Sequence, residues 1–224
     1  MLNLWFFLAV LFTALDWSAL CLKKQKVGYF SKPAVMLALI LWFSSRDGWQ
    51  AAPFSFGLAL SFSLVGDILL LLPDRFFLPG LISFLAAQVC YVIGFSPQSP
   101  VGSFSVFAIG ILVLGVGSYL FNNLRKNIER NPAYRNLITP ILFYSLALNM
   151  MLFSTILTLA QSSWLPTAAG LVAAGGMLFY ASDVLLSANR FIRPIPNGKL
   201  LVRILYHLGQ LGLTSGILLQ SLSA

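Results

Sequence analysis

Eight apolar runs, each about as long as a bilayer is thick, constrain the fold of this chain most strongly. A membrane-spanning helix needs about 20 mostly apolar residues. Hydrophobic residues make up 58% of the 224-residue chain and charged residues 9%, whereas soluble domains carry about 25% charged residues. The sequence therefore predicts an all-α polytopic membrane protein, with a single integral membrane domain over residues 1–224. The eight predicted transmembrane helices are 2–22, 33–45, 52–72, 76–95, 101–121, 136–159, 165–188 and 200–222.

Basic residues concentrate in alternate loops. All of the 14 Lys and Arg residues except Arg46 lie in or beside the loops that follow the first, third, fifth and seventh predicted spans. The positive-inside rule places these loops in the cytoplasm and both termini outside. This topological role also accounts for the net charge of +8, so we expect no nucleic-acid partner. The short chain and its loop-charge bias favour a bacterial inner (cell) membrane.

The N-terminal apolar run has no basic residue ahead of it. A cleaved signal peptide begins with a positively charged segment, followed by its apolar region. We therefore expect the first run to stay in the protein as a helix.

Two aspartates lie inside predicted spans, where a carboxylate costs roughly 2.5–3.5 kcal/mol and usually has a function. Asp67 lies in SLVGDILLLLPDRF and Asp183 in LFYASDVLLSANRF. In both segments the Asp is followed by an apolar residue, Leu-Leu, a short spacer and Arg-Phe. Each Asp lies near the cytoplasmic end of its span, and the two spans run in the same direction. We therefore predict that the two carboxylates meet across one cleft open to the cytoplasm.

The two Asp segments also indicate an internal repeat. Each Asp lies in the third span of its half, so the halves would be four-plus-four and parallel, related by an axis along the membrane normal. The similarity is short, and both duplication and convergence account for it.

Polar residues of other spans fall at the same predicted depth as the aspartates. In the last span they are spaced 0, 3, 4 and 7, which is one helix face. We predict that this group binds substrate or supports the two aspartates. Its alternative role is structural, as hydrogen bonds, ion pairs to the aspartates or, for the histidine, simple packing. The group is Lys32, Gln88, Tyr91, Tyr144, Ser182, Arg203, Tyr206, His207 and Gln210.

The remaining aspartates, Asp16, Asp47 and Asp74, lie near predicted helix ends or in loops. We interpret them as ordinary interfacial charges.

The residue types present favour acid–base chemistry over other hydrolytic mechanisms. One histidine and no paired cysteines cannot supply the three ligands usual for catalytic zinc, so we expect no metal and no cofactor. A Ser-His-Asp triad is only weakly supported, because Ser182 lacks a nucleophile-elbow context. An intramembrane aspartyl protease is disfavoured, because Leu64 stands where the Gly-x-Gly-Asp motif of these proteases has its first glycine. Two carboxyl groups close together in a low dielectric retain one proton between them, which provides an acid and a base for water addition.

Motifs spread over roughly residues 30–215 carry a family resemblance. They are Lys32-Pro33, Gly66-Asp67 before a Leu run, Phe76, Gly80, Phe84, Tyr91, Phe179, Ser182-Asp183, Phe191, Tyr206 and Gln210. In these motifs the chain resembles the YhhN/TMEM86 family of multi-pass membrane proteins, whose characterised members are lysoplasmalogenases. One departure is Gln88, where the resemblance leads us to expect a histidine.

The resemblance implies hydrolysis of the vinyl-ether bond of lysoplasmalogen, a lysophospholipid, to an aldehyde and a glycerophospho-base. The two aspartates suit this reaction, because one protonated Asp would protonate the double bond while its ionised partner activates water. The substrate phosphate would lie near Lys32, Lys199 or Arg203. The alternative function is a proton-coupled transporter or lipid-binding membrane protein that uses the same carboxylates.

Overall fold

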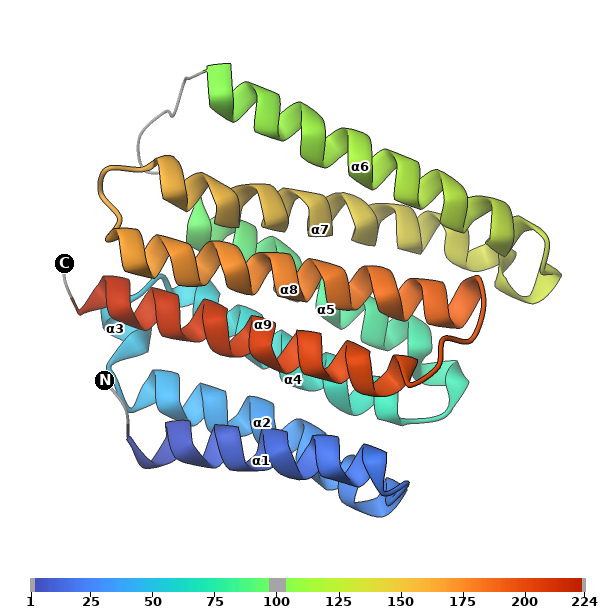
Figure 1. Cartoon of the computed structure of the whole chain (residues 1–224), viewed down its shortest axis with the longest axis horizontal. Helices are drawn as coiled ribbons and strands as arrows, with labels where there is room; N and C mark the ends of the chain where they lie inside the picture. The colour runs from blue at the N-terminus through green and yellow to red at the C-terminus, as the bar shows by residue number, and fades with distance from the viewer. Residues whose placement is uncertain (1–2, 97–103, 223–224) are drawn as a thin grey trace.

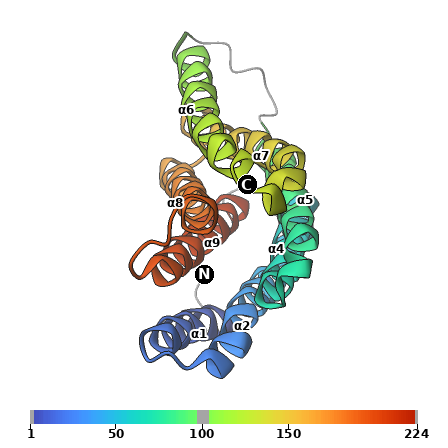
Figure 2. The same ribbon diagram turned by 90° about the vertical axis from the view of Figure 1, so that its right-hand side faces the viewer.

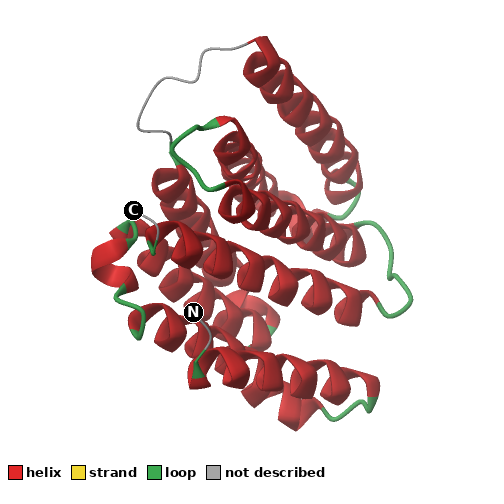
Figure 3. Ribbon diagram, turned by 60° about the vertical axis from the view of Figure 1, so that its left-hand side comes forward, coloured by secondary structure: helices red, strands yellow, loops and turns green. Residues whose placement is uncertain are grey.

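The computed structural model describes residues 3–96 and 104–222. They form a bundle of long helices in which successive helices run in opposite directions (Figure 1). These residues form helices and loops without strands (Figure 3), which confirms the predicted all-α fold. Short helices α3 (Gly48–Ala51), η1 (Asp74–Phe76), η2 (Pro132–Leu137) and η3 (Thr158–Ala160) lie in the connections. The long helices are α1 (Leu4–Cys21), α2 (Gln25–Ser44), α4 (Phe54–Leu71), α5 (Phe77–Phe95), α6 (Phe104–Glu129), α7 (Ile138–Leu157), α8 (Pro166–Phe191) and α9 (Gly198–Ser221).

Seven of the long helices in the described ranges are long and apolar enough to cross a membrane. The protein is therefore a polytopic membrane protein. The exception is α9, which carries Lys199, Arg203 and His207 in its first half. The predicted number of eight spans and the position of both termini outside stay predictions.

Two predicted spans are shorter than the helices that form. We expected 33–45, but α2 begins at Gln25, and Pro33 lies inside it. In the two turns before Pro33, Ser31 and Lys32 contact Asp16 and Asp67 on other helices. The predicted span 101–121 corresponds to α6, which continues to Glu129. Residue 2 and residues 101–103, where two predictions begin, lie outside the described residues.

The helices form a curved wall with a pair of helices facing it (Figure 2). The helices α1, α2, α4, α5 and α7 follow one another around the wall, and α8 and α9 pack together on its inner side. Helix α9 also contacts α1 and α2, whereas α6 lies at the edge against α7 and α8. Helix α1 begins and helix α9 ends at the same end of the bundle (Figure 1). The loops after α1, α4, α6 and α8, which carry the basic residues, lie at the other end.

Helices α8 and α9 approach each other closely because glycines line their contact. Small residues at such contacts allow membrane helices to approach closely. A Cβ atom added to Gly175 of α8 would lie 2.6 Å from the backbone nitrogen of Leu213. One added to Gly209 of α9 would lie 2.8 Å from the backbone nitrogen of Phe179. This close contact therefore depends on having glycine, which has no side chain, at positions 175 and 209.

We expect Gly175→Val to destabilise the protein, because its side chain would force α8 and α9 apart. Overpacking of this kind costs about 1–3 kcal/mol or more. The measurement is the thermal unfolding midpoint in detergent. Gly170→Val is the matched control on the same helix, because a Cβ at Gly170 meets nothing within 4 Å. An equal loss in both variants would contradict the role of the glycine contact.

Candidate active site

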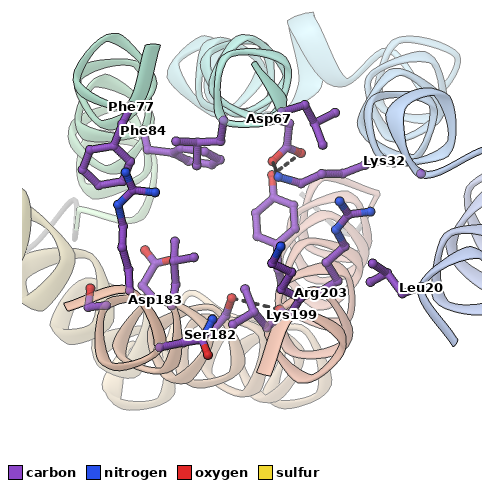
Figure 4. Close-up of a pocket in the computed structure, with 18 of the residues that line it drawn as sticks. Leu20, Lys32, Asp67, Phe77, Phe84, Ser182, Asp183, Lys199 and Arg203 are labelled. Atoms are coloured by element: carbon purple, nitrogen blue, oxygen red, sulfur yellow. Dashed lines mark hydrogen bonds and ion pairs between the residues drawn. The ribbon is translucent and has the colours of Figure 1, made fainter. Parts of the chain in front are cut away.

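A cavity of about 740 Å³ lies at the end of the bundle that carries the basic loops. The ends of α1, α2, α4, α5, α7, α8 and α9 surround it. Both Asp67 and Asp183 line this cavity. Figure 4 shows Asp67 on α4 and Asp183 on α8, on opposite sides of the open space. The depth predicted from the spans therefore brings the two carboxylates to one cavity.

Asp67 is fully buried and has a cation and a phenol as partners. Lys32 Nζ reaches across from α2 to within 2.8 Å of Asp67 Oδ1. Tyr206 of α9 donates a hydrogen bond of 2.9 Å to Asp67 Oδ2. The preceding Gly66 makes room for the ring of Phe84, which would lie 2.6 Å from a Cβ atom there. These contacts suit an ionised carboxylate, because the ammonium compensates its charge in a buried position.

Asp183 is buried in a different environment. The hydroxyl of Tyr144 on α7 donates a short hydrogen bond to Asp183 Oδ2. Among the described residues no Lys or Arg forms an ion pair with it. The neighbouring Ser182 donates to the carbonyl oxygen of Val202 at 3.0 Å and so ties α8 to α9. With one neutral partner, Asp183 lacks the compensating charge that Asp67 has.

Each aspartate therefore has its own partners. No hydrogen bond among the described residues joins Asp67 to Asp183. Direct sharing of one proton between them stays a prediction.

Four predicted site residues, Gln88, Tyr91, His207 and Gln210, do not line the cavity. Gln210 Nε2 donates to the hydroxyl of Tyr206 at 3.4 Å, and the Tyr91 hydroxyl donates to Gln210 Oε1 at 2.6 Å. This chain of hydrogen bonds runs from Asp67 into the core and fixes the Tyr206 hydroxyl. Gln88 is buried beside Tyr144, the partner of Asp183. The predicted residues that line the cavity itself are Lys32, Tyr144, Ser182, Arg203 and Tyr206.

His207 is buried and does not line the cavity. Its ring stacks on Trp17 of α1, with 6.5 Å between centroids. Neither ring nitrogen makes a hydrogen bond within the part of the chain that the structure describes. The packing interpretation of His207 fits these contacts better than a catalytic one.

Asp16 is the residue that our sequence interpretation misplaced. It is not an interfacial charge, because its side chain is fully buried on α1. Its Oδ1 lies 2.5 Å from Arg203 Nη1 and accepts a 2.7 Å hydrogen bond from Ser31. Asp16 lies five residues before the end of its helix, just as Asp67 lies near the end of its own. The criterion that singled out Asp67, a carboxylate inside a predicted span, would also have singled out Asp16.

The mouth of the cavity is basic. Lys23 and Lys24 follow α1, and Lys199 lies in the first turn of α9. Arg190 Nη2 lies 3.1 Å from Asp74 Oδ1, an exposed carboxylate beside the opening. Lys23, Lys24 and Arg190 were not among our predicted site residues. A cavity with cations at its mouth and apolar side chains on α4, α5 and α8 suits an anionic amphiphile.

Comparison with known proteins identifies relatives of the chain. The chain is 29% identical to lysoplasmalogenase TMEM86B of Homo sapiens, over 81% of this chain and 70% of the relative. It is 27% identical to lysoplasmalogenase TMEM86B of Rattus norvegicus, over 82% of this chain and 69% of that protein. The protein of the same name in Sus scrofa is 28% identical, over 82% and 72%. No solved structure matches the chain.

The family comparison covers most of the sequence. The sequence model of the YhhN family matches residues 27–217. This range includes Lys32, Asp67, Asp183 and Arg203, but it begins after Asp16. The chain belongs to the YhhN family.

Proposed function

We propose that this protein is a lysoplasmalogenase-like hydrolase that cleaves the vinyl-ether bond of a lysophospholipid. The observation that carries the proposal is the pair of buried aspartates, in different environments, on opposite sides of one cavity. The relatives named lysoplasmalogenase support the same reaction class. The alkenyl chain would lie along the apolar lining of Leu70, Leu81 and Leu186. With the basic loops in the cytoplasm, substrate enters from that leaflet.

The contacts of the two aspartates divide the roles between them. Asp183 is the proton donor, because Tyr144 donates to its Oδ2 and leaves Oδ1 to carry a proton. Asp67 is the base, because the ammonium of Lys32 and the hydroxyl of Tyr206 stabilise its ionised form. Two carboxyl groups in unlike environments are a common way to obtain an acid and a base at one pH.

The reaction then follows from these roles. Asp183 protonates the vinyl-ether carbon remote from the ether oxygen, which leaves an oxocarbenium cation. Asp67 takes a proton from water as the water oxygen adds to the cationic carbon, giving a hemiacetal. The hemiacetal collapses to a fatty aldehyde and the glycerophospho-base, as the hydroxyl proton leaves and the departing oxygen gains one. The net reaction consumes one water molecule, and Asp183 and Asp67 return to their starting states.

We expect hydrolysis in D₂O to place a single deuterium on the aldehyde carbon next to the carbonyl. The reason is that protonation on carbon is the first step of the proposed reaction. The aldehyde is reduced at once with borohydride, and mass spectrometry of the resulting alcohol measures its deuterium content. A saturated 1-O-alkyl lysolipid is the control, because it has no double bond to protonate and should release no product. Hydrolysis without deuterium on carbon would contradict the mechanism.

The transporter alternative has a distinct outcome in the same assay. A protein that only moves a solute with protons would release no aldehyde from any vinyl-ether lipid. Reconstituted vesicles would instead show proton movement that depends on the solute. Aldehyde release that depends on both aspartates excludes this alternative as the sole function.

A further inference from the structure

Arg203 is held in the cavity wall by contacts from two other helices. Its Nη1 lies 2.5 Å from Oδ1 of the fully buried Asp16, which Ser31 also contacts. Gly28 of α2 lies against the same group, since a Cβ added there would be 3.4 Å from Arg203 Nη1. The guanidinium group therefore packs against both α1 and α2.

The rest of the guanidinium stays available to a ligand. No hydrogen bond among the described residues uses Nε or Nη2 of Arg203, and 16% of the side chain is exposed in the cavity that it lines. An arginine presents five N–H donors in a planar fork that matches the oxygens of a phosphate. With one edge fixed by Asp16, the fork is already oriented before a phosphate arrives.

The level of Arg203 along α9 suits a phosphate of the proposed substrate. Arg203 precedes Tyr206, the partner of Asp67, by three residues, which is a rise of ~4.5 Å toward the mouth. In a lysoplasmalogen the glycerol carbons separate the phosphate from the vinyl ether. A phosphate at Arg203 would leave the vinyl ether near Asp67, one helical turn deeper.

We propose that Arg203 is the phosphate-binding residue of this cavity and that Asp16 is its positioning residue. The inference rests on the proposed lysophospholipid substrate and adds the group that recognises it. Asp16 lies on α1, before the residues 27–217 that the family model matches. The recognition site thus includes a helix that the family comparison does not cover.

The other cations of the cavity suit other roles. Lys32 lies 2.8 Å from Asp67 and compensates its charge. Lys23, Lys24 and Lys199 are exposed at the mouth, where a flexible, solvated ammonium attracts anions but orients them weakly. Arg190 pairs with the exposed Asp74. Arg203 pairs with the buried Asp16 and, unlike a lysine, keeps a planar edge of further donors toward the cavity.

The test compares two ligands that the protein cannot cleave, in detergent with the full chain. One is a saturated 1-O-alkyl lysophosphocholine, and the other is the matching 1-O-alkylglycerol, which lacks the phosphate. We expect Arg203→Gln to raise the Kd of the phosphate ligand by roughly 10–100-fold and to leave the Kd of the alkylglycerol unchanged. Asp16→Asn should give a smaller change in the same direction. General damage to the cavity would weaken both ligands equally, so the difference between them isolates phosphate recognition.

Two further variants keep the result interpretable. Asp16→Asn combined with Arg203→Gln leaves no charge buried alone, so it should fold even where Asp16→Asn does not, and should still lack the preference for phosphate. Arg193→Gln removes a charge at the same end of the bundle, from an exposed residue outside the cavity lining, and should change neither Kd. Equal effects of Arg203→Gln on the two ligands, or no effect, would overturn the proposal. Because neither ligand is cleaved, absence of vinyl-ether hydrolysis would leave this result readable.

Discussion

Replacing Asp183 by Asn is expected to abolish aldehyde release from lysoplasmalogen while leaving the folded protein intact. Asn keeps the shape of the side chain and can accept the hydrogen bond from Tyr144, but it has no acidic proton to give to carbon. General acid–base catalysis contributes about 10²–10⁴-fold, and we expect a loss in this range or larger. The measurement is the initial rate of aldehyde formation in detergent, alongside the thermal unfolding midpoint.

Asp67→Asn should cause a comparable loss of rate, because the base that activates water is then missing. The matched control is Asp47→Asn at the opposite end of the bundle. Asp47 is exposed and has a positive φ of 53°, a conformation that Asn also adopts readily. Near-normal turnover in either Asp67→Asn or Asp183→Asn would refute the assigned roles, provided that Asp47→Asn behaves like the unmodified protein.

Replacing Lys32 by Met should destabilise the protein strongly. Met has a similar length but leaves Asp67 fully buried without its cation at 2.8 Å. Removing one partner of a buried ion pair typically costs about 3–5 kcal/mol. The free energy of unfolding in mixed detergent measures the loss, and the hydrolytic rate should fall with it, because Asp67 would no longer be stabilised as a base.

A double variant separates the charge from the packing. Lys32→Met with Asp67→Asn removes both charges, so most of the lost stability should return while activity stays absent. Lys26→Met is the control, because Lys26 is an exposed residue of the same helix and should shift stability by no more than about 0.5 kcal/mol. Additive losses in the double variant would mean that the ion pair is not what Lys32 contributes.

Hydropathy and charge predict the bundle well because lipid imposes a simple rule. Each stretch long enough to cross must be apolar and helical, and the ends of α4, α5 and α8 lie within a few residues of the predicted ones. The rule weakens where a helix runs on through polar residues. The first two turns of α2 mix Lys26 and Lys32 with apolar residues and precede Pro33, so we began the predicted span at Pro33. Two of their side chains, Ser31 and Lys32, contact partners that lie on other helices.

Depth could be predicted for the site, but the direction of side chains around a helix could not. Asp67 and Asp183 were assigned one level from the spans, and they do line one cavity. His207 and Tyr206 were assigned one face of α9, yet α9 has neighbours on several sides. Tyr206 faces Asp67 while His207 faces Trp17. Which neighbouring helix a side chain contacts depends on how the helices are arranged around one another. The spacing of residues along one helix does not reveal this arrangement.

The cavity lies at one end of the bundle, so under the proposed function the protein would reach lipids of one leaflet only. If the basic end lies in the cytoplasm, as the positive-inside rule predicts, the proposed hydrolase would draw its substrate from the inner leaflet. Lysolipids formed in the outer leaflet would first have to cross the bilayer, so flipping would set their rate of removal. The protein would then act as a one-sided sink that maintains a difference in lysolipid content between the two faces of its membrane.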